Sequence, residues 1–266
     1  MKFIIDYVSA IVTLFGLMLG FGLLNSFIEI QATKYTFWNF GKLGLFISSF
    51  IGTTIHELSH TFFIVLFGND IKNFRLFPRL NDIGSGKPLG YVQYSYKKTF
   101  LGMISLFFIG IGPILGGPLI ILVFLKLLLP TVYDNIYNSI IVNLNESKNI
   151  LILLKDTIVS FLKGITSIEI LSDWKFYLFI LIASSIACHV TLSFADIKGA
   201  TKGLGFVLIG IFIVGLICAI LPFKEKVLEF IFLITSFLSL LWIISFIFSI
   251  LTFLIQYFLH YLIRRN

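Results

Sequence analysis

Six long apolar runs restrict what this chain can fold into. Each has about 18 or more mostly apolar residues, the length that a helix needs to cross the hydrocarbon core of a bilayer. The runs are about Phe3–Phe27, Phe40–Gly68, Phe100–Leu129, Trp174–Phe194, Leu204–Leu221 and Val227–Leu262. Charged residues make up 12% of the chain, against about 25% in soluble domains. The formal charge of +7 needs no nucleic-acid partner, because basic residues commonly flank membrane spans.

The runs predict an all-α polytopic membrane protein with about six transmembrane helices, in a single membrane domain over residues 1–266. Lysine and arginine are denser in the segments that would share one side with both termini. We therefore expect a multi-pass protein of the cell membrane with both termini in the cytoplasm. In the first run, Gly16 and Gly20 form a small-xxx-small pair, which predicts close helix packing.

Two segments outside the runs have their own patterns. Residues 70–97 alternate polar and apolar residues around a Gly, Asn and Asp-rich centre. This pattern predicts a small cytoplasmic β-hairpin after the second helix, with an ordinary loop as the alternative. Residues 146–170 carry apolar residues at helical spacing with lysines between them. That pattern predicts an amphipathic helix lying in the membrane interface.

The second run contains the sequence His-Glu-Leu-Ser-His at residues 56–60. On a helix, His56 and His60 are one turn apart and project from the same face, as two zinc ligands do. Glu57 would then lie beside the open coordination position, where it can act as a general base. Ionisable residues inside a membrane span are costly and mark functional sites. The motif therefore predicts a zinc site within the membrane.

A catalytic zinc site needs a third protein ligand. Asp196 is predicted at the end of the fourth run, just before a glycine turn, and His189 is two helical turns earlier on the same face. Asp196 as the ligand would leave His189 to stabilise the oxyanion or hold the substrate backbone. His189 as the ligand is the alternative, and the residues alone leave both open.

Taken in order, these motifs resemble those of the site-2 protease family of intramembrane zinc metalloproteases. The His56–His60 motif is followed by Leu89-Gly90-Tyr91-Val92, which is similar to the family's glycine-tyrosine-valine strand region, and then by Asp196. The Gly112-Pro113 stretch is similar to the family's glycine-proline segment. The resemblance covers about residues 45–200 and fits a divergent member or a related membrane zincin-like family.

The resemblance implies a zinc metalloendopeptidase that binds one Zn²⁺ per chain. Its substrates would be transmembrane or signal-peptide-like, held in the lipid bilayer, and residues 204–262 would form two additional C-terminal spans. The implied residues are His56, His60 and Asp196 as metal ligands, Glu57 and His189 in catalysis, and Gly90, Tyr91 and Val92 in substrate binding.

Two other functions fit parts of the pattern. A non-catalytic scaffold or chaperone would use a closed zinc site with both Asp196 and His189 as ligands. A transporter would use the His, Glu and Asp cluster as an ion path. Transporters commonly have repeated halves with broken helices in each, whereas here only the third run is predicted to be interrupted, at residues 110–118. The protease is the interpretation that the pattern favours.

Overall fold

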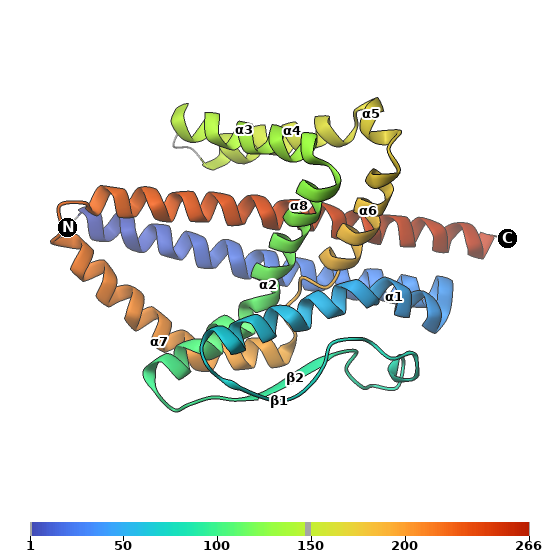
Figure 1. Cartoon of the computed structure of the whole chain (residues 1–266), viewed down its shortest axis with the longest axis horizontal. Coiled ribbons are helices and arrows are strands. Elements are labelled where there is room, and N and C mark those ends of the chain that lie inside the picture. Colours follow the sequence, from blue (N-terminus) through green and yellow to red (C-terminus); the bar gives the residue numbers. More distant parts are fainter. Residues whose placement is uncertain (1, 147–149, 266) are drawn as a thin grey trace.

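The computed structural model describes residues 2–146 and 150–265, which form eight α-helices, a short 3-10 helix and a two-stranded sheet. In Figure 1, α1 and α8 follow the longest axis, α2 and α6 cross them, and the hairpin lies on the side opposite α3 and α4. The elements are α1 (Lys2–Leu66), β1 (Asp70–Arg75), η1 (Leu80–Asp82), β2 (Tyr91–Ser95), α2 (Phe100–Leu128), α3 (Pro130–Glu146), α4 (Ile150–Ile165), α5 (Ile168–Leu171), α6 (Trp174–Ala187), α7 (Phe194–Ala219) and α8 (Lys224–Arg265).

Helix α1 contains the first two predicted runs and turns back on itself at Gly41. This glycine has φ +63° and ψ −154°, a left-handed conformation that side chains disfavour. The first half of α1 runs to one end of the molecule and the second half returns from it (Figure 1). The break thus places two membrane-length helical segments next to each other without a loop.

Among the described residues, four helices are long and apolar enough to cross a membrane: α1, α2, α7 and α8. This confirms the mostly helical fold with a small sheet, whereas the predicted number of about six spans differs. Two predicted runs share α1, and the fourth ends early, because α6 has 14 residues. The cytoplasmic position of the termini and the division into a core and additional spans stay predictions.

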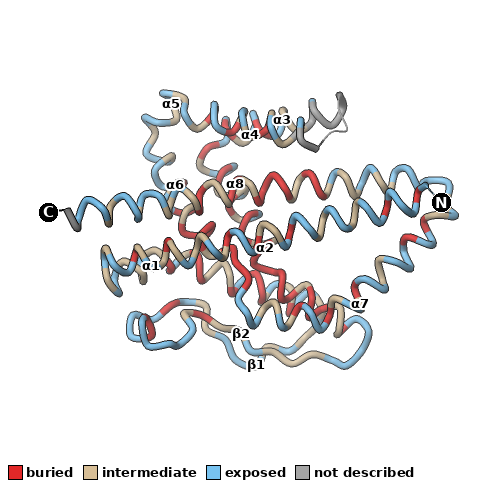
Figure 2. Tube along the Cα trace, turned by 180° about the vertical axis from the view of Figure 1, so that it is seen from behind, coloured by how far each residue is buried: buried red, intermediate tan, exposed pale blue. Residues whose placement is uncertain are grey.

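Helix α2 is continuous through the stretch that was predicted to interrupt it, so that prediction was wrong. Pro113 and Pro118 both lie inside the helix. Four glycines in the same stretch remove the side chains that would otherwise keep neighbouring helices away. The consequence is a helix that other helices approach closely at its centre, where buried residues gather (Figure 2).

The predicted hairpin is present as an antiparallel pair of strands. Phe74 of β1 pairs with Val92 of β2, with an irregularity between Ile71 and Asn73. The connection between the strands is tied to β1 by an ion pair of 2.6 Å between Arg75 Nη1 and Asp82 Oδ2. A two-stranded sheet leaves one unpaired edge on each strand.

The segment predicted as one interfacial helix over 146–170 is divided in the structure. Glu146 ends α3, residues 147–149 lie outside the described residues, and Ile150–Ile165 and Ile168–Leu171 form α4 and α5. Helix α3 was not predicted from the sequence; it packs against α4 through buried residues that include Val132, Ile136 and Phe161. These helices form a layer over the outer ends of α2 and α6 (Figure 1).

Candidate metal centre

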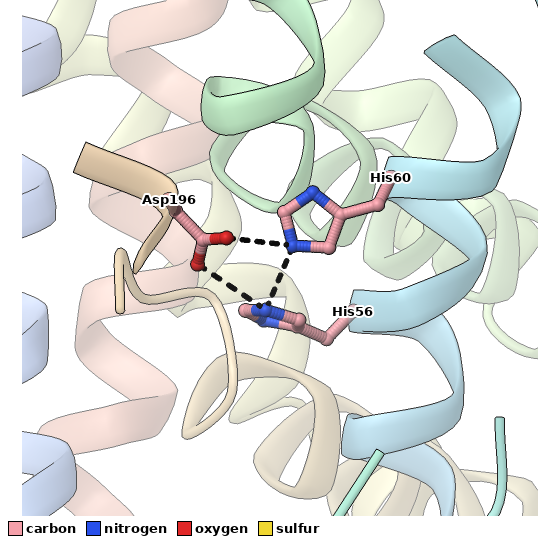
Figure 3. A group of neighbouring side chains, drawn as sticks. All are labelled: His56, His60 and Asp196. Atoms are coloured by element: carbon pink, nitrogen blue, oxygen red, sulfur yellow. Dashed lines mark hydrogen bonds and ion pairs between the residues drawn. The ribbon is translucent and has the colours of Figure 1, made fainter. Parts of the chain in front are cut away.

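Three side chains from two distant parts of the chain converge at the centre of the molecule. His56 and His60 project from the second half of α1, and Asp196 comes from α7 (Figure 3). The two Nε2 atoms are 3.2 Å apart. His60 Nε2 is 3.2 Å from Asp196 Oδ1, and His56 Nε2 is 3.7 Å from Asp196 Oδ2. Since one ligand atom from each residue lies within 4.8 Å of the others, the group could hold a metal ion.

The histidine rings are oriented by hydrogen bonds to backbone carbonyls. His56 Nδ1 donates to His189 O at 2.9 Å, and His60 Nδ1 donates to Ile109 O at 2.7 Å. A carbonyl oxygen can only accept, so each ring carries its proton on Nδ1. Both Nε2 lone pairs therefore face the centre, which is the arrangement of metal-binding histidines with outer partners.

Asp196 lies in the first turn of α7, which corrects the prediction that it ends the fourth span. Helix α6 ends at Ala187, so His189 and Asp196 are not two turns apart on one helix. Ser193 caps α7: its Oγ accepts from Asp196 N at 3.1 Å, and its own N–H donates to Asp196 Oδ2 at 2.9 Å. The Ser-x-x-Asp spacing is a helix-start signal that the sequence contained.

Glu57 is buried beside the ligands, with 7% of its surface exposed. Gly90 lies directly against it, because a β-carbon at residue 90 would be 2.6 Å from Glu57 Cγ and 2.9 Å from Oε1. The residue before β2 therefore touches the predicted base, and Tyr91 and Val92 continue from it along β2.

His189 contributes its backbone rather than its ring to this group. Its carbonyl accepts from His56, and its ring Nδ1 donates to Ser185 O at 2.9 Å. Among the described residues, the three-ligand group consists of His56, His60 and Asp196. The prediction that the His189 ring contacts the oxyanion or the substrate stays a prediction.

The first half of α1 supplies two polar residues that the sequence analysis missed. Asn25 is fully buried, and its Nδ2 donates to Ala187 O at 2.9 Å and to Val190 O at 2.8 Å. These bonds hold the loop that presents the His189 carbonyl to His56. Glu29 follows one turn later on the same face of the helix. Two polar residues four apart in an apolar run were a signal for such a role.

Glycines of α2 bring the two ligand-bearing helices together. A β-carbon at Gly110 would be 2.6 Å from Asp196 O, and one at Gly116 would be 2.2 Å from Ser59 Oγ. Larger residues at these positions would force α7 or α1 away from α2. By contrast, a β-carbon at Gly16 or Gly20 would meet nothing within 4 Å, so the close packing predicted for that pair is absent.

No protein-family model, curated protein or solved structure matches this chain. The resemblance to the site-2 protease family thus rests on its motifs alone and stays a prediction. The arrangement of His56, Glu57, His60 and Asp196 is therefore the basis for assigning a function.

Proposed function

We propose that this protein is an intramembrane zinc metalloprotease that hydrolyses peptide bonds of transmembrane or signal-peptide-like substrates. The observation that carries the proposal is the convergence of two Nε2 lone pairs and one carboxylate, with Glu57 adjacent in sequence and buried beside them. Catalytic zinc sites use three protein ligands of these types and keep a fourth position for water. Structural zinc sites, by comparison, are closed by four protein ligands.

Zinc, when bound, supplies Lewis acidity and lowers the pKa of a water ligand to about 7. Glu57 accepts a proton from the attacking water while the oxygen of that water bonds to the carbonyl carbon of the substrate. The C–N bond then breaks, and Glu57 delivers the proton to the leaving amine nitrogen. The backbone carbonyls of Ile109 and His189 keep the two histidine rings in the orientation that binding requires.

Two features beside the site support a polypeptide substrate. The first is the hairpin, whose unpaired strand edge can add an extended peptide segment and whose Gly90 touches Glu57. The second is a cavity of about 670 Å³ that reaches His189 and is lined by apolar residues of α1, α6 and α8, which include Leu43, Ile47, Leu181 and Ile255. It suits apolar side chains next to the scissile bond.

The hydropathy of the helices supports a membrane location. Both halves of α1 are as long as a membrane span, and with α2, α7 and α8 they would enclose the ligands within the bilayer. We propose a multi-pass protein of the cell membrane with both termini in the cytoplasm. Water would then reach the site through a protein-lined cavity.

The metal content of the protein purified in detergent without chelator tests the ligand set. We expect about one zinc per chain in the wild type, loss of zinc with Asp196→Ala, and retention with His189→Ala. Retention without Asp196 and loss without His189 would refute this ligand set. A wild type that binds zinc but cleaves no peptide would favour the non-catalytic scaffold.

Cleavage of a panel of fluorogenic single-span peptides in proteoliposomes tests the role of Glu57. We expect Glu57→Gln to keep its zinc and lose cleavage by about 10²-fold or more, because the water loses its general base. Glu169→Gln, on exposed α5, is the matched control and should retain full activity. Wild-type activity in Glu57→Gln would refute the mechanism.

A further inference from the structure

The two prolines inside α2 each remove one backbone hydrogen bond from the helix. In an α-helix, the N–H of residue i donates to the carbonyl of residue i−4. Proline has no N–H, and its ring pushes against that same carbonyl. Pro113 therefore leaves Ile109 O without its helical donor, and Pro118 does the same to Ile114 O.

Both carbonyls are taken by side chains of other helices. Ile109 O accepts from His60 Nδ1 of α1 at 2.7 Å, and Ile114 O accepts from Trp242 Nε1 of α8 at 3.0 Å. Ile109 and Ile114 are 2% and 0% exposed. A buried carbonyl without a hydrogen-bond partner is costly. Each proline therefore leaves one buried acceptor, which a side chain of another helix satisfies.

We propose that Pro113 is a positioning residue of the metal centre: because it leaves Ile109 O without a helical donor, it sets the tautomer and orientation of His60. A carbonyl oxygen accepts hydrogen bonds through two lone pairs. Ile109 O must therefore point toward the His60 ring as well as lack a helical donor. With an N–H at residue 113, the carbonyl would align with the helix axis and point away from the His60 ring. The inference rests on the proposed metal site and is independent of proteolysis.

Pro118 is the internal control for this inference. It has the same chemistry, lies in the same helix and frees a carbonyl five residues further on. Its carbonyl holds Trp242, which packs in a core cluster with Met18 and Ile114 rather than in the ligand group. Substitutions at the two prolines can therefore be compared to separate an effect on metal binding from an effect on the packing of α2.

The test compares Pro113→Ala with Pro118→Ala in full-length protein in detergent. Zinc affinity is measured by competition with a chelating dye, and ligand geometry by the visible spectrum of Co²⁺. We expect Pro113→Ala to bind zinc about 10- to 100-fold more weakly, the usual effect of losing an outer partner, with an altered Co²⁺ spectrum. Pro118→Ala should bind within about twofold of the wild type. Equal losses in both variants, or no loss in Pro113→Ala, would overturn the proposal.

A second measurement keeps the test independent of metal binding. In metal-free protein, ¹⁵N NMR of labelled histidine, assigned with His60→Gln, should place the His60 proton on Nδ1 in the wild type and Pro118→Ala. In Pro113→Ala we expect a mixture of tautomers. An unchanged His60 signal would refute the proposal, even if the wild type bound no zinc and the proposed function were wrong.

A third variant covers the case in which Pro113→Ala folds poorly. Lactic acid in place of residue 113 forms an ester, which also lacks an N–H, so Ile109 O again has no helical donor. We expect this variant to recover zinc affinity toward the wild-type value. A zinc affinity about 10-fold or more below that of the wild type would show that the missing N–H does not position His60, and would overturn the proposal.

Discussion

Gly52 is the position where the structure makes the sharpest prediction about helix packing. It lies one turn before His56 on the second half of α1, and its N–H donates to Ser185 Oγ of α6 at 3.1 Å. A β-carbon at residue 52 would be 2.2 Å from Ser185 O and 2.4 Å from His189 Nδ1. The first atom is backbone, and the second belongs to a ring that is hydrogen-bonded to Ser185 O at 2.9 Å.

Neither of these atoms can move away as the end of a flexible side chain would. To restore ordinary contact, α1 and α6 would have to separate by about 1 Å. Overpacking of this kind costs about 1–3 kcal/mol, and the better helix propensity of alanine returns about 1 kcal/mol. We expect Gly52→Ala to lower the free energy of unfolding by up to about 2 kcal/mol. It should also weaken zinc binding, because the His189 carbonyl moves with α6.

Chemical denaturation in detergent and zinc titration measure the two effects. Gly20→Ala is the matched control, because a β-carbon there meets nothing within 4 Å. It should keep or raise stability by up to about 1 kcal/mol and leave zinc affinity unchanged. If Gly52→Ala were as stable as Gly20→Ala and bound zinc equally well, the packing of α1 against α6 described above would be wrong.

Two further predictions concern the metal centre. Ser193→Ala removes the cap of α7, because the Asp196 backbone N–H loses its acceptor, Ser193 Oγ. It should destabilise the protein by about 1 kcal/mol and weaken zinc binding, because the first turn of α7 carries the Asp196 ligand. Ser193→Thr should recover both, and a zinc titration in which Ser193→Ala equals the wild type would contradict the role. Removal of zinc by a chelator should lower the free energy of unfolding by about 2.7 kcal/mol relative to protein with free zinc at 100 times its dissociation constant, and a melting temperature insensitive to zinc would exclude a stably bound metal.

The sequence by itself determined the features that depend on neighbouring residues. Apolar runs of membrane length predicted long helices, and α2, α7 and α8 confirm three of them. The spacing of His56 and His60 predicted two imidazoles on one helix face, and the alternation in 70–97 predicted the paired strands. These patterns have short periods, so the local geometry of a helix or strand is enough to read them.

The tertiary structure alone decided how the site is completed. Helix α6 ends at Ala187 although residues 165–198 contain neither glycine nor proline. Its last carbonyl, Ala187 O, accepts from the Asn25 side chain, 162 residues away in the chain, and such a partner cannot be predicted from the residues around the helix end. For this reason Asp196 was placed on the wrong helix.

The tertiary structure also decided which glycines are packing contacts and which carbonyls bind the histidine rings. Gly16 and Gly20 have the spacing of a packing motif but no neighbour, whereas Gly52 and Gly116 are in direct contact with other helices. Spacing along the chain says which residues share a face, and it does not say what lies opposite that face. The residue pattern of the chain determined which side chains could act, and only packing between distant helices decided which carbonyls and glycines position them.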